Sequence, residues 1–133
     1  MPTAVIVLDT HAWLWWVAEP GRLSRTAREA IDHAQRLGVT TVSCWELAML
    51  AEAGRIALDR PVEIWVEQAL ADERTQSLPL TSTVAVRAAL LGRERFGGDP
   101  ADRMIYSTAR DAGVKLVTRD RRIRTFDPRG TIW

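Results

Sequence analysis

The stretch Ala4-Val5-Ile6-Val7-Leu8-Asp9 decides the fold class of this 133-residue chain. It is a continuous apolar run, rich in β-branched residues and without polar alternation, which is typical of a strand buried on both faces. Asp9-Thr10 follows directly and can cap a helix from His11 to about Ala18. A buried strand that leads at once into a helix favours a parallel sheet covered by helices.

The rest of the chain continues this alternation of strands and helices. Further extended segments are expected at 39–42, 76–80 and 114–118, with a final edge strand at 131–133. Further helices are expected at 25–37, 44–53, 61–72, 83–93, 100–112 and 120–124. Ser24, Ser43 and Asp99 are the expected N-caps, and Gly38, Gly54 and Gly113 the expected helix ends. The pattern predicts an α/β protein with three layers, α/β/α, around a central, mostly parallel sheet.

Composition excludes several classes of protein. Hydrophobic residues make up 47% and charged residues 26% of the chain, the balance of a globular domain, and no apolar run is long enough to span a membrane. The start Met1-Pro2-Thr3 lacks a basic region and a cleavage pattern, so we expect no signal peptide and a cytoplasmic protein. The single cysteine, Cys44, leaves no partner for an internal disulfide or a cysteine zinc site.

Charge is distributed unevenly along the chain. Residues 1–92 carry 8 basic and 11 acidic side chains, whereas residues 93–133 carry 10 and 6. All but one of the 18 basic residues are arginine, whose planar guanidinium suits phosphate. A solvated basic face and a phosphate-binding surface are both consistent with this pattern. The candidates for contacts with phosphate groups are Arg103, Arg119, Arg121 and Arg122.

Four carboxylates stand where the predicted strands end or where a helix begins: Asp9, Glu46, Asp102 and Asp120. The carboxyl ends of parallel strands lie at one edge of a sheet, where open α/β sheets bind their ligands. Carboxylates gathered there repel one another unless a divalent cation or a raised pKa relieves the repulsion. The sequence therefore predicts a site for Mg²⁺ or Mn²⁺, which bind oxygen ligands.

Each carboxylate also has a purely structural interpretation. Asp9 and Asp120 can be helix caps, and Glu46 can complete the capping box Ser43-x-x-Glu46. Asp99, directly before Pro100, is mainly a cap with a possible outer role at the cation. Capping does not explain why four acids share one sheet edge, so we favour the metal site. The hydroxyls that could orient carboxylates or water there belong to Thr10, Ser43 and Thr118.

Other site chemistries find little support in the sequence. His11 has no adjacent Ser or Cys nucleophile, and His33 lies inside a predicted helix without an evident partner. No glycine-rich nucleotide-binding motif follows the first strand, and Gly97-Gly98 is too short to count as one. Neither a catalytic triad nor a nucleotide cofactor is expected.

Four motifs in order along the chain resemble PIN-domain ribonucleases, in particular the VapC-type toxins of bacterial toxin–antitoxin pairs. They are Leu8-Asp9-Thr10-His11-Ala12, Ser43-Cys44-Trp45-Glu46-Leu47, Asp99-Pro100-Ala101-Asp102-Arg103 and Thr118-Arg119-Asp120. The resemblance covers nearly the whole chain and implies one PIN-like nuclease domain over residues 1–133. Relatives with the Asp-Pro-x-Asp-Arg motif often have His two residues before its first Asp, where this chain has Gly97.

The resemblance also implies a function. Asp9, Glu46, Asp102 and Asp120 would bind Mg²⁺ or Mn²⁺ in an endoribonuclease that forms a homodimer and is inhibited by a small cognate antitoxin. The alternatives are another metal-dependent nuclease or a phosphatase with the same acidic pocket, and a PIN-like RNA-binding module without catalysis. The RNA target, the identity of the antitoxin and the number of metal ions are left open.

A cluster of tryptophans adds a hypothesis about partners. Trp13, Trp15 and Trp16 crowd one short predicted helix, and a rotation of 100° per residue prevents all three from facing one core. Either two pack inward and one is partly exposed, or the three contribute to a surface for the antitoxin or a second copy. An antitoxin Arg or Lys entering the acidic pocket would compete with the metal.

Overall fold

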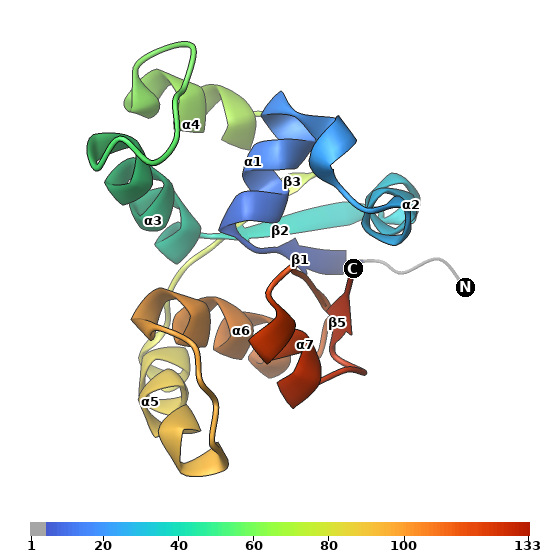
Figure 1. Cartoon of the computed structure of the whole chain (residues 1–133), viewed down its shortest axis with the longest axis vertical. Helices are drawn as coiled ribbons and strands as arrows, with labels where there is room; N and C mark the ends of the chain where they lie inside the picture. Colours follow the sequence, from blue (N-terminus) through green and yellow to red (C-terminus); the bar gives the residue numbers. More distant parts are fainter. Residues whose placement is uncertain (1–4) are drawn as a thin grey trace.

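A central sheet of five parallel strands organises the computed structural model, which describes residues 5–133 (Figure 1). The strand order is β3-β2-β1-β4-β5, with β1 in the middle. The strands are β1 Val5–Leu8, β2 Arg36–Thr40, β3 Thr75–Leu78, β4 Leu116–Val117 and β5 Thr131–Ile132. Ala4, expected to begin the first strand, lies outside the described residues. Every strand pair in the described part of the chain is parallel, so the carboxyl ends of all five strands share one edge.

Within residues 5–133, seven helices surround this sheet. They are α1 Thr10–Ala18, α2 Arg25–His33, α3 Thr41–Glu52, α4 Val62–Leu70, α5 Ser82–Leu90, α6 Pro100–Ala112 and α7 Arg121–Phe126, with short 3-10 turns at Pro20–Arg22 and Leu91–Glu94. In Figure 1, α1 to α4 lie on one side of the sheet and α5 to α7 on the other. The three-layer α/β/α architecture predicted from the sequence is confirmed.

The alternation of side chains along β1 produces two cores. Ile6 and Leu8 point into a cluster built with α1, α2 and α4, while Val7 points into a cluster built with α6 and α7. All three side chains are almost completely buried. Successive residues of a strand face opposite sides, so an uninterrupted apolar run is what a strand covered on both faces requires.

Aromatic rings fill the core on the α6 side. Phe96, Tyr106 and Phe126 pack against one another with ring centroids 5.2–5.7 Å apart. Gly98 follows closely on Phe96, and a Cβ atom at Gly98 would lie 2.8 Å from the Cβ of Asp102 and closer still to the Phe96 ring. The absence of a side chain at Gly98 therefore lets the loop lie directly on this cluster at the start of α6.

The helix predicted over 25–37 is wrong over its last four residues, 34–37. Helix α2 ends at His33, and β2 begins at Arg36. Arg74 donates hydrogen bonds from Nη1 to the carbonyls of Ile31 and Ala34, at 2.8 and 3.0 Å, and so satisfies the end of the helix. This contact comes from 40 or more residues away in the sequence, which is why the local pattern does not reveal the helix end.

The boundary between the second strand and α3 also differs from expectation. The strand predicted at 39–42 ends at Thr40, and Thr40 rather than Ser43 is the N-cap, because its Oγ1 accepts the backbone N–H of Ser43 at 3.0 Å. Glu46 therefore lies in the second turn of α3, and the predicted capping box Ser43-x-x-Glu46 is wrong. The capping interpretation of Glu46 loses its basis.

Other expected boundaries agree closely with the structure. Asp9, Ser24, Asp99 and Asp120 are N-caps whose side chains accept backbone N–H groups, and Gly113 ends α6 with φ at +69°. The helix predicted over 61–72 is α4, which is shorter at both ends, and the helix predicted over 83–93 divides into α5 and a 3-10 turn. The strand predicted at 114–118 shortens to Leu116–Val117, and the predicted edge strand is β5.

Of the three tryptophans of α1, two pack inward and one is partly exposed, which is the first of the two arrangements considered from the sequence. Trp13 and Trp15 are buried, whereas Trp16 is partly exposed. Trp13 packs edge-on against Trp65 of α4, with ring centroids 5.3 Å apart.

Within the described residues, no helix has the length and apolar character to cross a membrane.

Candidate metal centre and active site

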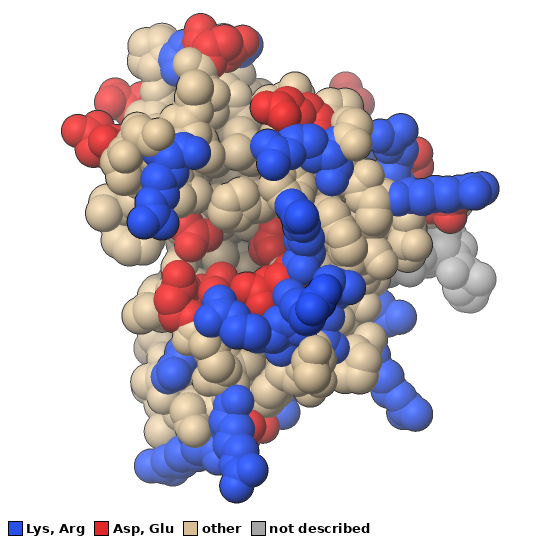
Figure 2. Space-filling model, in the orientation of Figure 1, with Lys and Arg blue, Asp and Glu red and all other residues tan. Residues whose placement is uncertain are grey.

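The four predicted carboxylates line one cavity at the carboxyl edge of the sheet, together with Asp99. The cavity has a volume of about 950 Å³ and is bounded by the start of α1, the middle of α3, and the starts of α6 and α7. In Figure 2, acidic side chains gather in a hollow in the middle of the visible face, and basic side chains lie along its rim. The topology therefore brings together acids that are up to 111 positions apart, Asp9 and Asp120.

Asp9 occupies the deepest position of this group. Its Oδ1 accepts the backbone N–H of Ala12 at 2.8 Å, which caps α1. Burial raises the pKa of Asp9, against the opposing effects of hydrogen bonds from Thr118 and Ala12. The negative charge of nearby Glu46 adds to the rise in the pKa. A buried carboxylate beside a second one is electrostatically unfavourable and would be stabilised by a cation.

Glu46, Asp99 and Asp102 form the tightest cluster. One carboxylate oxygen from each lies within 4.8 Å of the other two. Asp99 caps α6 by accepting the N–H of Asp102 at 2.8 Å through Oδ1. The sequence assigned Asp99 mainly to capping, and the structure shows a cap that also faces two other acids. A carboxylate has two oxygens, so capping with one leaves the other available to a cation.

The ionisation of Asp102 is strongly perturbed. Burial raises the pKa of Asp102 to about 7, and the charges of Asp99, Glu46 and Asp120 contribute to the same rise. The carboxyl resists ionisation because it is removed from water and lies near like charges, and a divalent cation bound beside it would stabilise the charged form.

Asp120 lies on the other side of the cluster and is already engaged by its own helix. Its Oδ1 accepts the N–H groups of Arg122 and Ile123 at 2.8 and 3.3 Å, and its own N–H donates to the hydroxyl of Thr118 at 3.0 Å. The second oxygen, Oδ2, pairs with the guanidinium of Arg122 at 3.3 Å. The Thr118 hydroxyl thus contacts both Asp9 and the backbone N–H of Asp120.

The other two predicted hydroxyls bond to each other. The Thr10 hydroxyl donates to Ser43 at 3.1 Å, and both side chains are buried. This bond joins the start of α1 to the start of α3 and so fixes the spacing between the helices that carry Asp9 and Glu46. Thr10 and Ser43 support the site by holding these helices together.

The predicted arginines divide into two groups. Arg119, Arg121 and Arg122 line the cavity. Arg103 is directed elsewhere, since its Nε donates to the carbonyl of Gly98 at 3.1 Å and its guanidinium lies beside Gly92. Its contacts within the described structure are those of a loop support.

Two further arginines, which the sequence did not indicate, also line the cavity. Arg22 and Arg55 lie in turns after α1 and α3, without a motif or an adjacent acid that would mark them. The guanidinium carbon of Arg22 is 4.7 Å from the centroid of the Trp15 ring, and that of Arg119 is 5.8 Å away. Trp15 is therefore a buried support for two cavity arginines.

The acidic cluster fits a hard divalent cation. Oxygen ligands of Mg²⁺ and Mn²⁺ bind at about 2 Å, so opposite ligands of one ion are separated by about 4 Å. The spacing within 4.8 Å among Glu46, Asp99 and Asp102 accommodates such an ion with small side-chain adjustments. Asp9 and Asp120 flank the cluster, and the set contains only oxygen donors.

Comparison with known proteins identifies the family. The PIN domain family model matches residues 6–127. Ribonuclease VapC22 of Mycobacterium tuberculosis (strain ATCC 25618 / H37Rv) is 47% identical over 130 residues, which cover 96% of this chain and 98% of that relative.

Solved structures agree on the fold. DNA-bound VapBC from Salmonella typhimurium superposes with a TM-score of 0.69 at 20% identity over 97% of both chains. A toxin–antitoxin complex from Klebsiella pneumoniae does so with 0.68 at 17% identity over 96% of both. With its acidic cavity at the carboxyl edge of a parallel sheet and these matches, this chain belongs to the PIN-domain family, in its VapC branch.

Proposed function

We propose that this chain is a metal-dependent endoribonuclease and the toxin component of a bacterial type II toxin–antitoxin system. The observation that carries the proposal is the cluster of Glu46, Asp99 and Asp102, flanked by Asp9 and Asp120 in one cavity. The 47% identical relative, which is named a ribonuclease, supports RNA as the substrate. Residues 1–133 would act as one nuclease domain in the cytoplasm.

The residues of the chain would divide the work of phosphodiester hydrolysis. Glu46, Asp99 and Asp102 would hold Mg²⁺ or Mn²⁺, with Asp9 and Asp120 completing the negative site. A bound divalent cation supplies Lewis-acid chemistry, since it polarises a phosphate oxygen and lowers the pKa of water. The carboxylates would orient the attacking water in line with the leaving oxygen, and no side-chain nucleophile is required.

The arginines around the acids would position the RNA. Arg119 and Arg121 line the same cavity as the carboxylates, and Arg22 and Arg55 line it from the turns after α1 and α3. Guanidinium groups bind phosphate oxygens without regard to base identity. This arrangement would place one phosphate at the acids and neighbouring phosphates along the arginines.

Substrate class is the direct test of the proposal. Purified protein is incubated with single-stranded RNA, single-stranded DNA of the same sequence and a small phosphomonoester, each with Mg²⁺, with Mn²⁺ or with EDTA. We expect internal cleavage of RNA that needs the cation. Preferential cleavage of DNA or of the phosphomonoester would support the other nuclease or phosphatase alternative, and binding of RNA without cleavage would support the non-catalytic module.

The protein partners are part of the same proposal. The solved relatives from Salmonella typhimurium and Klebsiella pneumoniae are a VapBC and a toxin–antitoxin complex, which supports a cognate antitoxin for this chain. An antitoxin Arg or Lys would enter the acidic cavity and compete with the cation there. Copurification with the product of a small adjacent reading frame would identify this partner.

Exposed apolar residues on α3 support the proposed homodimer. Trp45 and Met49 lie one turn apart and are 58% and 51% exposed. Leu80, also exposed, donates its backbone N–H to the Thr41 hydroxyl at 3.3 Å and so lies beside the start of α3. Large apolar and aromatic side chains of this kind are enriched at protein interfaces. We call Trp45, Met49 and the adjacent Leu80 the α3 surface.

Sedimentation analysis tests whether the α3 surface forms the homodimer. We expect Trp45→Ala to shift wild-type dimer toward monomer by about tenfold in dissociation constant. Ile64→Ala is the matched control, because Ile64 is an exposed apolar residue of α4 outside this surface. A wild-type protein that is monomeric at micromolar concentration would contradict the homodimer.

A further inference from the structure

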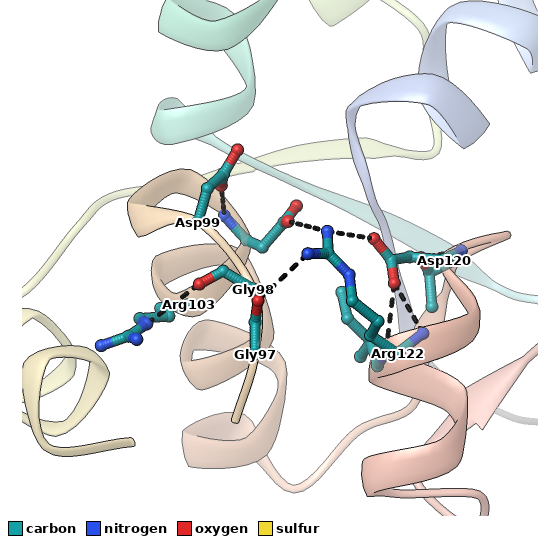
Figure 3. A network of polar contacts seen from close by, with 9 residues as sticks. Gly97, Gly98, Asp99, Arg103, Asp120 and Arg122 are labelled. Carbon is teal, nitrogen blue, oxygen red and sulfur yellow. Dashed lines mark hydrogen bonds and ion pairs between the residues drawn. The ribbon is translucent and has the colours of Figure 1, made fainter. Parts of the chain in front are cut away.

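The guanidinium of Arg122 lies between two of the proposed metal-binding carboxylates. Its Nη2 is 3.3 Å from Oδ2 of Asp120 and 3.8 Å from Oδ2 of Asp102. Its Nη1 donates to the carbonyl of Gly97 at 3.1 Å. Figure 3 shows Arg122 reaching from α7 toward Asp120 and the Gly97–Gly98 loop. Three attachment points hold the same charged group at the edge of the acidic cluster.

These attachments differ in strength. Asp120 binds Arg122 twice, through the backbone N–H at 2.8 Å and through the guanidinium at 3.3 Å. The separation from Asp102, 3.8 Å, exceeds hydrogen-bond distance and leaves an attraction between charges alone. The Arg122 side chain is 62% exposed, so it can move without disturbing the core. The contact with Asp102 is therefore the one most easily given up.

Asp102 is shared by two sets of charges. One of its oxygens lies within 4.8 Å of ligand atoms of Glu46 and Asp99, where a cation would bind. Its Oδ2 faces the guanidinium of Arg122. A divalent cation beside the guanidinium would repel it across a few ångströms of partly desolvated space, where charge interactions are stronger than in bulk water.

We infer that Arg122 is an exchangeable counter-ion of Asp102. It pairs with the ionised form of Asp102 in the metal-free protein, and a divalent cation at Glu46, Asp99 and Asp102 displaces it from that carboxylate. Asp120 and the Gly97 carbonyl retain the displaced side chain at the mouth of the cavity. There the guanidinium, no longer paired with Asp102, is available to a phosphate of the RNA.

This inference rests on the proposed metal site and adds an order of events to it. The cation and the guanidinium compete for Asp102, so metal binding precedes the release of Arg122 toward the substrate. Arg122 is a positioning residue in the metal-free protein and a phosphate contact afterwards. Removal of its charge should therefore strengthen metal binding while it weakens RNA binding.

The test is a titration of Mn²⁺ into the full chain at pH 8, followed by calorimetry or by the electron paramagnetic resonance signal of free Mn²⁺. We expect Arg122→Gln to bind Mn²⁺ about tenfold more tightly than the wild type, because it lacks the competing charge. Arg121→Gln is the matched control. Arg121 is the preceding residue, lines the same cavity and makes no ion pair within the described structure, so its Mn²⁺ affinity should change less than twofold.

Two results would overturn the inference: an unchanged Mn²⁺ affinity in Arg122→Gln, or an equal gain in Arg121→Gln, which would show a long-range charge effect only. Nuclear magnetic resonance of the wild type gives a second measurement that needs no variant to fold. Addition of Mg²⁺ should shift the side-chain Nε signal of Arg122 and leave that of Arg121 unchanged, and a stationary Arg122 signal under saturating Mg²⁺ would overturn the inference. If wild type binds no Mn²⁺ at millimolar concentration, the metal site itself fails.

Discussion

The two sides of the acidic cavity manage their negative charge differently. On the α1 and α3 side, Asp9 is partly exposed, accepts hydrogen bonds from Ala12 and Thr118, and makes no ion pair in the described structure. On the α6 and α7 side, Asp102 and Asp120 are partly exposed and share the guanidinium of Arg122. The helix-capping hydrogen bonds of Asp9 and Asp120 cannot be given up without unfolding a helix end, whereas the exposed side chain of Arg122 can move away. The α6 and α7 side is therefore the adaptable side of the site.

The largest expected effect comes from removal of one charge on either side. Asp9→Asn and Asp102→Asn should each lower the rate of RNA cleavage by at least about a hundredfold, because each weakens the negative site that holds the cation without removing volume. Cleavage is followed on labelled RNA in Mg²⁺, and circular dichroism confirms the fold of each variant. Asp32→Asn, on the exposed face of α2, is the control. A folded variant of either residue that cleaves at the wild-type rate would exclude it from the site.

A smaller effect concerns stability and pH. The pKa of Asp102 is about 7 in the folded protein and 3.8 in the unfolded chain, so the folded state holds more protons between these values. Without metal, the free energy of unfolding should therefore decrease as pH rises from 4 to 7 and level off above 7. The raised pKa of Asp9 acts in the same direction.

Asp102→Asn removes most of this pH dependence. We expect the free energy of unfolding of the variant to be higher than that of the wild type by on the order of 2 kcal/mol at pH 8 in EDTA. The difference should be smaller at pH 5. Urea unfolding at both pH values in EDTA measures it, with Asp32→Asn as the control. Equal stability of Asp102→Asn and wild type at pH 8 would show that Asp102 is not under electrostatic strain.

The next effect concerns the affinity of the proposed antitoxin, which should change about tenfold with the concentration of Mg²⁺. If an antitoxin cation enters the acidic cavity, binding should weaken about tenfold when Mg²⁺ rises from micromolar to millimolar at constant ionic strength. Asp120→Asn should weaken it as well. Isothermal titration with the antitoxin peptide measures both. An affinity that ignores Mg²⁺ and Asp120 would place the antitoxin on another surface.

The smallest effect is expected at the partly exposed tryptophan of α1. Trp16 lies near Arg74, whose guanidinium carbon is 5.7 Å from the ring centroid, and packs at the edge of the core. Trp16→Ala should cost about 1 kcal/mol in stability and leave RNA cleavage unchanged. The result is checked by thermal unfolding and by cleavage rate. A loss of antitoxin affinity in this variant would restore Trp16 to an interaction surface.

The sequence predicted the site residues that directly follow the end of a strand. Asp9 and Asp120 follow β1 and β4 and cap the next helices, so a strand, an acid and a helix start sufficed to place them. Parallel topology then predicted that their carboxylates share an edge. Asp99 was recognised as a cap, yet its proximity to Glu46 depends on how α6 meets α3, which no local pattern encodes.

The parts that could not be predicted depend on contacts between distant segments. Arg74 ends α2 through carbonyls 40 and 43 positions away, so the helix appeared longer in the sequence. Arg22 and Arg55 reach the cavity from turns that carry no motif. Apolar periodicity records which face of an element is buried, but it does not record which side chain from elsewhere satisfies its ends.

The two glycines before α6 place opposite limits on how the sequence can diverge. A side chain at position 97 would enter open space, with the nearest atom, Cδ of Arg122, 4.0 Å from its Cβ. A side chain at position 98 would collide with Phe96 and push Asp102 away from its neighbours. A Cβ atom at position 97, where relatives often carry His, therefore meets no clash. Position 98 should tolerate almost no replacement, although its residue contributes no reactive group. The lack of a side chain at Gly98 leaves the space that the Asp102 side chain needs to stay in position.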